Sequence, residues 1–108
     1  MRQDIPLGTL DMLILKVLSR REPLHGFEIA NHIQSMSDEV LQVEEGSLYP
    51  ALQRMLAKGW VAATWGKTEE NRRARYYKMT AAGHKHLSQE LSRYDAVSLA
   101  IGRVLGRA

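Results

Sequence analysis

The sequence predicts a mainly α-helical fold with a small antiparallel β-hairpin: a winged helix-turn-helix followed by a long C-terminal helix. Three observations predict it. Three segments before residue 59 carry apolar residues at helical spacing. Two aromatic and β-branched runs then flank a polar tip, as in a hairpin. A single amphipathic segment follows and continues to the C-terminus.

The composition is that of one globular domain. The chain has 108 residues, of which 44% are hydrophobic and 25% charged. No apolar run approaches the roughly 18 residues typical of a membrane span, and residues 1–10 contain no apolar export signal. Cysteine is absent, which excludes disulfides and thiolate metal sites. We therefore expect a cytoplasmic protein without a cofactor and without a membrane partner.

The first two helices follow from their apolar spacing and end signals. Thr9 is the predicted N-cap of the first helix, and Gly26 opens the second. We expect 35–43 to be an irregular connection. The residues that predict the buried face of the first helix are Leu10, Leu13, Ile14, Val17 and Leu18, and those of the second are Ile29, Ala30, Ile33 and Met36.

A third helix is predicted to begin between Glu44 and Ser47 and to end near Lys58, with Gly59 as its stop. Pro50 lacks an N–H group, so we expect it near the start of this helix. The predicted buried residues are Leu48, Leu52, Met55 and Leu56.

Residues 60–65 and 75–79 are predicted to be the two strands of the hairpin, joined by a charged tip at 66–74. Thr80 is the predicted N-cap of a final helix that extends to about Leu105. We expect residues 1–80 to form a DNA-binding domain and residues 81–108 a dimerisation helix, together in one compact unit.

Charge is distributed unevenly along the chain. Residues 1–45 contain four Lys or Arg and eight Asp or Glu, whereas residues 46–86 contain eight and two. A polyanion such as DNA is the natural partner of the basic segment, because contacts with phosphates release counterions. The same distribution is also compatible with a solvated basic face, and charge alone leaves both interpretations open.

The order of elements is typical of proteins that place the third helix in the major groove of DNA and the hairpin against the backbone. Helical geometry puts small and polar residues on the side of the third helix opposite its buried stripe. There Gln53 can pair with adenine and Arg54 with guanine or a phosphate, while the Ser47 and Tyr49 hydroxyl groups can bind phosphates. An ordinary surface helix is the alternative. The predicted DNA-binding residues are Gly46, Ser47, Tyr49, Pro50, Gln53, Arg54, Lys67, Arg72, Arg73 and Arg75.

The final helix carries more apolar surface than a small monomer leaves in water. Several of its apolar positions are seven residues apart, as in a coiled coil. This spacing favours packing against a partner helix in a two-fold symmetric dimer. Packing entirely within the chain, against the first helix, is the alternative. A dimer would present two recognition helices roughly 34 Å apart and so predicts an inverted-repeat operator. The predicted interface residues are Leu87, Leu91, Tyr94, Ile101 and Leu105.

Motifs of catalysis and metal binding are not found. The sequence has no phosphate-binding glycine loop and no His-Glu-x-x-His run. His84 and His86 are two residues apart on a predicted helix and point to different sides, so we predict neither an enzyme nor a metal site. Trp60 and Trp65 bracket the first hairpin strand and are interpreted as packing residues.

Several of these segments together are similar to a known family. Gly46-Ser47-Leu48-Tyr49-Pro50-Ala51-Leu52, Gly59-Trp60 and Arg73-Ala74-Arg75-Tyr76-Tyr77-Lys78-Met79-Thr80 with Gly83 resemble the PadR family of transcriptional regulators. The opening Leu7-Gly8-Thr9-Leu10 and the run Leu24-His25-Gly26-Phe27-Glu28-Ile29 are similar too. The resemblance covers about residues 5–105. It departs from the family mainly at the acidic Glu69-Glu70 of the hairpin tip, which weakens the expected contact there.

This resemblance implies a homodimeric repressor that binds a pseudo-palindromic site, with residues 47–50 on DNA and the hairpin arginines assisting. It implies the short subgroup of the family, in which one C-terminal helix crosses its dimer mate. It also implies a response to small aromatic compounds, for which Tyr94 is the candidate pocket residue, although plain core packing is the alternative for Tyr94. The rival function is a winged-helix module that binds an acidic protein rather than specific DNA.

Overall fold

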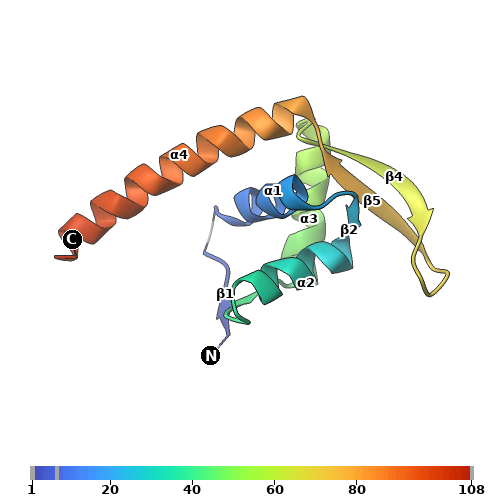
Figure 1. The fold of residues 1–108 in the computed structure, drawn as a ribbon, viewed down its shortest axis with the longest axis horizontal. Helices are drawn as coiled ribbons and strands as arrows, with labels where there is room; N and C mark the ends of the chain where they lie inside the picture. The colour runs from blue at the N-terminus through green and yellow to red at the C-terminus, as the bar shows by residue number, and fades with distance from the viewer. Residues whose placement is uncertain (1, 7, 108) are drawn as a thin grey trace.

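A computed structural model describes residues 2–6 and 8–107. Leu7, which the resemblance included, lies outside the described residues, as do Met1 and Ala108 at the ends of the predicted regions. The chain forms helices and short strands in alternation, with one long hairpin before the last helix (Figure 1). The elements are β1 (Gln3–Asp4), α1 (Leu10–Arg20), β2 (Leu24–His25), α2 (Gly26–Met36), β3 (Leu41–Gln42), α3 (Glu45–Ala57), β4 (Val61–Lys67), β5 (Arg73–Met79) and α4 (Ala81–Val104).

The helix predictions are confirmed within a few residues, and two of the end signals act as expected. The Thr80 hydroxyl group accepts a hydrogen bond from the Gly83 N–H at 3.0 Å, which caps α4. Gly59 follows α3 with a φ of +76°, the left-handed conformation that glycine adopts without strain. Thr9 occupies the N-cap position of α1 but does not cap it, because its hydroxyl group donates to the Pro6 carbonyl instead.

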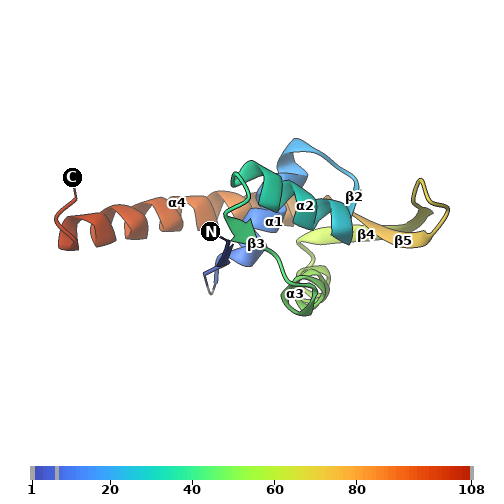
Figure 2. The ribbon, with the colours of Figure 1, turned by 90° about the horizontal axis from the view of Figure 1, so that it is seen from below.

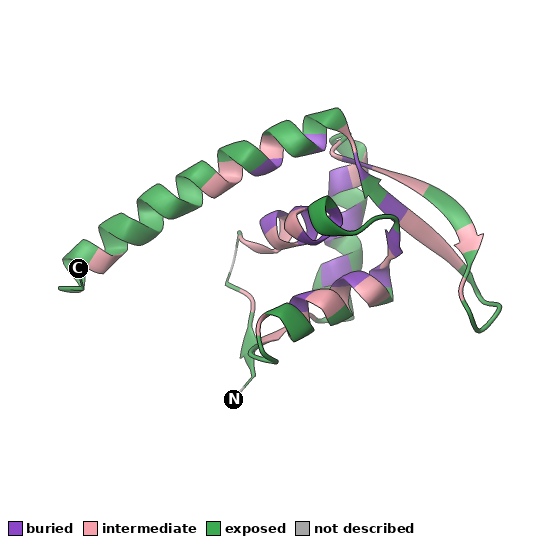
Figure 3. Ribbon diagram, in the orientation of Figure 1, coloured by how far each residue is buried: buried purple, intermediate pink, exposed green. Residues whose placement is uncertain are grey.

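The hydrophobic core forms around α1, which lies between α4 and α2 (Figure 1). Ile14 and Leu15 of α1 are fully buried and contact residues from the other helices and the hairpin. The predicted stripe of α3 is buried at Leu48, Leu52 and Met55. Figure 3 shows buried residues along one side of α1, α2 and α3, whereas in α4 they are confined to its first turns.

The predicted two-stranded hairpin has a third strand. β2 pairs antiparallel with β5, so the sheet order is β2-β5-β4. The pairing sets Leu24, which is buried, opposite Tyr77. A two-residue strand is too short to produce a periodic pattern in the sequence, which is why it was not predicted. For the same reason the parallel pairing of β1 with β3 could not be anticipated.

The hairpin strands are also longer than predicted. β4 and β5 remain in register as far as Lys67 opposite Arg73, and the connecting loop is confined to 68–72. Lys67 and Arg73 therefore lie on strands rather than in the tip. The strand prediction stopped early because these residues are polar, whereas backbone pairing continues regardless of side-chain hydropathy.

The last helix changes character along its length. Its first turns pack on α1, and its C-terminal half projects into solvent away from the other elements (Figures 1 and 2). The radius of gyration is 15.0 Å, compared with about 13 Å for an average compact chain of this length. The end of this helix and the tip of the hairpin lie at opposite ends of the longest axis, along which the molecule extends 52 Å (Figure 1).

Candidate nucleic-acid interface

The outer face of α3 is open to solvent. Figure 2 shows this helix at the lower edge of the molecule, with the hairpin extending to one side and α4 to the other. Its exposed side carries little side-chain bulk, because glycine, serine and proline occupy three of its positions. No atom lies within 4 Å of a Cβ placed at Gly46. A helix with so little bulk on its outer face can approach another surface closely. The exposed residues of this face are Gly46, Ser47, Tyr49, Pro50, Gln53 and Arg54.

The hairpin of β4 and β5, here called the wing, carries three of the four positive side chains of its strands on one face, and Lys78 lies on the other. Residues paired across the hairpin point to the same side, and side chains alternate along each strand. Lys67 pairs with Arg73, and Trp65 pairs with Arg75. The same face begins at the base of the wing with the pair Val61 and Met79, which are buried in the core. The same face of the wing is therefore buried in the core at its base and carries exposed charged side chains near its tip.

A groove of about 650 Å³ separates α3 from the wing. Helix α3 contributes Tyr49 and Gln53, and the wing contributes Trp65, three arginines and Glu70. Residues at the start of α2 also line it. The groove therefore joins a polar helix face that can read bases with guanidinium groups that bind phosphates. The arginines are Arg72, Arg73 and Arg75, and the α2 end supplies His25, Gly26 and Phe27.

Tyr49 is positioned by a close contact with α2. Its ring lies so near Gly26 that a Cβ at that position would be 2.9 Å from Cε1 of Tyr49. Tyr77 lies behind it, and burial raises the pKa of the Tyr77 phenol, with the Arg75 charge acting in the opposite direction and Tyr49 adding to the increase. Tyr77 is therefore an uncharged packing residue, while Tyr49 keeps an exposed edge toward the groove.

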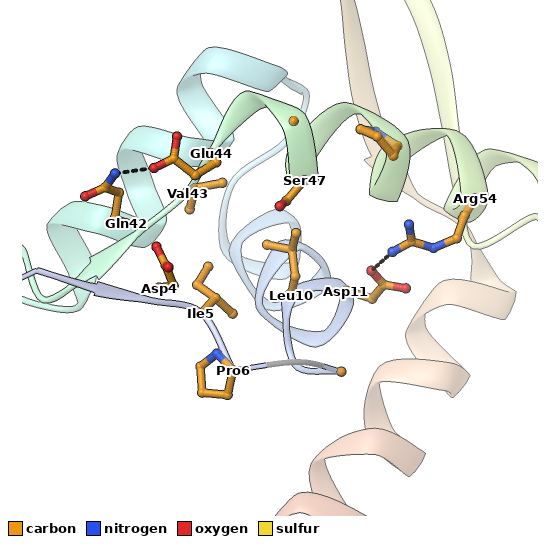
Figure 4. A pocket seen from close by; sticks show the side chains of 13 residues that line it. Asp4, Ile5, Pro6, Leu10, Asp11, Gln42, Val43, Glu44, Ser47 and Arg54 are labelled. Atoms are coloured by element: carbon orange, nitrogen blue, oxygen red, sulfur yellow. Dashed lines mark hydrogen bonds and ion pairs between the residues drawn. The ribbon is translucent and has the colours of Figure 1, made fainter.

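Arg54, predicted to contact guanine or a phosphate, also makes an ion pair with α1. Its guanidinium group donates to the Asp11 carboxylate of α1 at 3.1 Å, across 43 residues of sequence. The pair lies at a second pocket, of about 450 Å³, between α3 and the N-terminal segment (Figure 4). Asp4 and Glu44 also line this pocket, which makes that flank acidic. The two flanks of α3 thus differ in charge, and the basic one faces the wing.

Replacing Asp11 by asparagine is expected to increase DNA affinity about three- to tenfold, since it removes a negative charge beside α3 and frees Arg54. Titration of labelled duplex by fluorescence anisotropy at fixed salt measures the change. Asp95→Asn, which alters an exposed carboxylate on α4, is the matched control and should have little effect. A lower affinity for Asp11→Asn would instead show that Asp11 holds Arg54 in its binding position.

The predicted dimer residues do not share one environment. Leu87 is only 6% exposed and belongs to the core of its own chain, so it offers almost no surface to a partner. Leu91 is partly buried against the same core. Tyr94 and Ile101 are exposed on the projecting half of α4, and Leu105 is exposed one residue beyond it. The first two of these residues are covered because α1 packs against the first turns of α4, and the other three lie farther along and remain exposed.

Tyr94 lines a pocket of about 150 Å³ between the start of α1 and α4, together with Met12 and Val97. Sites for small molecules usually measure about 300 to 1,000 Å³. The pocket of a single chain is smaller than this range.

The two tryptophans have different surroundings. Trp60 stacks on His86 of α4 with ring centroids 3.5 Å apart, in agreement with its prediction as a packing residue. The packing prediction was wrong for Trp65, which is 58% exposed on the wing. Phe27, at the start of α2, is also an exposed aromatic residue of the groove that sequence reasoning did not select. In the sequence, Phe27 stands out only as part of the run Leu24-His25-Gly26-Phe27-Glu28-Ile29, which resembles the family.

Within residues 2–6 and 8–107, no three histidine or acidic side chains gather in a way that could hold a metal ion. In that part of the chain there is also no helix of the length and apolarity required to cross a membrane.

Three helices, a three-stranded sheet and a basic groove between α3 and the wing define a winged-helix DNA-binding protein. Residues 14–89 match the profile of the Transcriptional regulator PadR-like family. The chain therefore belongs to the PadR-like family and is a DNA-binding transcriptional regulator rather than an enzyme.

Solved structures agree with this assignment. A transcriptional regulator from Clostridium thermocellum is 27% identical with a TM-score of 0.81, over 89% of this chain and 92% of that one. A PadR-like transcriptional regulator from Bacillus cereus is 26% identical with a TM-score of 0.74, over 91% and 92%. A protein of Lysinibacillus sphaericus described as uncharacterized is 29% identical over 96 residues, which are 89% of this chain and 87% of that protein.

Proposed function

We propose that this regulator is a repressor that binds a pseudo-palindromic operator as a homodimer. Residues 1–80 would bind DNA, and residues 81–108 would hold the two chains together. The observation that carries the DNA-binding part is the groove in which the exposed Gln53 of α3 lies beside the arginines of the wing. Gln53 would read adenine in the major groove, and the wing would bind the adjoining backbone.

The proposed dimer rests on the apolar stripe of α4. Residues advance about 100° per position around a helix, so Leu87, Tyr94 and Ile101 lie along one side. This side packs in the core at Leu87 and becomes exposed at Tyr94, which still borders the start of α1, and at Ile101 farther along the helix. A second copy of α4 would cover it, as two-fold symmetric dimers commonly do. A dimer that covers adjacent major grooves would exclude polymerase from a promoter, which is why we propose repression.

An aromatic effector would act at Tyr94. The small pocket there is open, and a second α4 crossing it would add walls to the cavity. Ligand binding at that crossing would change the separation of the two α3 helices and so weaken the fit to both half-sites. This part of the proposal depends on the dimer.

The primary test is anisotropy of a labelled duplex from the region upstream of the gene, with unlabelled random duplex as competitor. We expect tight binding that random DNA displaces poorly, since specific sites bind about 10³-fold or more tighter than random ones. Equal displacement by any duplex would contradict operator recognition at this site. No binding to either duplex would favour the rival function, a module that binds an acidic protein.

Replacing Gln53 by alanine is expected to weaken binding to the operator about tenfold, because a bidentate base contact is lost. Affinity for random duplex should remain unchanged, since Gln53 carries no charge. The same anisotropy titrations measure both affinities. Gln89→Ala, an equal change on the exposed side of α4, is the control and should alter neither. Equal weakening on both duplexes would argue against base recognition by Gln53.

A further inference from the structure

Trp65 lies within the charged face of the wing without packing against the core. More than half of its side-chain surface is in solvent, although an indole is among the largest apolar groups of the chain. On the same face, Arg75 is its direct partner across the hairpin, and Arg73 lies diagonally from it. Burial of apolar surface does not explain a tryptophan in this place.

Both arginines are held over the ring of Trp65. The guanidinium carbon of Arg73 is 4.5 Å from the ring centroid, and that of Arg75 is 5.5 Å from it. These separations are within the range of cation–π attraction. Among the described residues neither arginine has an ion pair or a side-chain hydrogen bond, and the buried Nε of Arg75 has no hydrogen-bond partner. The ring is therefore the contact that restrains both cationic groups.

We infer that Trp65 is a positioning residue, which holds Arg73 and Arg75 in advance in the orientation that binds the DNA backbone. This inference rests on the proposed function. Two like charges on neighbouring positions of one strand repel each other, and the negative face of an aromatic ring offsets that repulsion. A long side chain also loses rotamer freedom when it binds a phosphate, and one that is already restrained loses less.

Lys67 provides the internal comparison. It lies on the same face of the wing, opposite Arg73, and carries the same charge. No contact joins its ammonium group to the Trp65 ring, whereas both arginines make such a contact. The inference thus predicts that Trp65 acts through the arginines and not through Lys67.

The first experiment needs no DNA. Side-chain NMR signals of Arg73 and Arg75 in the free protein should show ring-current shifts, which Trp65→Leu should abolish and Trp65→Phe should largely retain. The Lys67 signals should not move in either variant. Absence of shifted arginine signals in the wild-type protein would overturn the inference.

The second experiment measures binding to random duplex at low salt in three backgrounds. Trp65→Leu should weaken binding about tenfold in the wild-type and Lys67→Ala backgrounds, because two long side chains must then be ordered on binding. In the Arg73→Ala, Arg75→Ala background the same change should alter affinity less than about twofold, because the groups that Trp65 positions are gone. Trp65→Phe should restore most of the affinity, and melting temperatures should confirm that every variant is folded.

An equal loss in all three backgrounds would show that Trp65 itself contacts DNA and would overturn the positioning role. No loss in the wild-type background would overturn it as well. If the wild-type protein bound neither random nor operator duplex, the proposed function would fail, whereas the ring-current shifts would still report whether the arginines are held. The two failures are therefore distinguishable.

Discussion

Replacing Gly83 by alanine is expected to lower the free energy of unfolding by about 3 kcal/mol or more. A Cβ at this position would lie 2.0 Å from the carbonyl oxygen of Trp60, far inside van der Waals contact. That carbonyl cannot turn away, because it accepts the hydrogen bond from the Thr80 N–H at 3.1 Å. The first turn of α4 would have to move off the wing, and its N-cap bond from the Gly83 N–H to Thr80 would be lost.

Chemical denaturation at a fixed protein concentration measures this change, and the melting temperature should fall by roughly 13 °C or more. Gly46→Ala is the matched control, since Gly46 is also helical but has open space around its Cβ position. Alanine there should stabilise the protein by about 0.5 to 1 kcal/mol, as in an ordinary helix. A Gly83→Ala protein as stable as the wild type would show that α4 and the wing are not in close contact.

Replacing Ile101 by aspartate is expected to convert the proposed dimer to a monomer and to weaken operator binding by about 100-fold or more. Ile101 is 53% exposed in the single chain, so the change should not disturb the core. In a dimer it would place an unpaired charge in an apolar seam. Loss of the second half-site removes a gain in affinity that commonly reaches about 10² to 10⁴. Leu91 is less suitable for this test, because it packs against the core.

Sedimentation gives the oligomeric state, and anisotropy with whole-operator and half-site duplexes gives the affinities. The half-site affinity should be unchanged, which separates loss of dimerisation from loss of the DNA surface. Leu99→Asp is the control, because Leu99 is equally exposed but lies about 160° around the helix from Ile101. Monomers from Leu99→Asp alone would place the interface on the opposite face of α4. Dimers from both variants would exclude this helix as the interface.

Much of the fold could be predicted from local sequence. Apolar residues at helical spacing identified all four helices, and the aromatic runs identified the wing. Thr80 and Gly59 marked helix ends correctly because a cap and a left-handed residue depend on chemistry within a few positions. The exposed face of α3 also followed from the sequence, since the buried stripe determines which residues lie opposite it.

Contacts between distant segments could not be predicted in this way. The ion pair between Arg54 and Asp11 joins two helices 43 residues apart, and neither helix by itself contains a sign of it. The cation–π contacts of Trp65 depend on the register of β4 against β5, which shifts every pairing if it slips by one position. The sequence pattern alone therefore predicts packing for an aromatic residue in a strand.

The sequence by itself determined the order of the elements, the inward face of each helix and the basic character of residues 46–86. Only the tertiary structure decided how far along each helix the apolar face is buried. Leu87 and Ile101 belong to one apolar stripe, but only Leu87 is buried. The physical reason is that periodicity states which side of a helix avoids water, while burial depends on how far the neighbouring helix reaches. Here α1 stops short, and the rest of α4 remains in solvent.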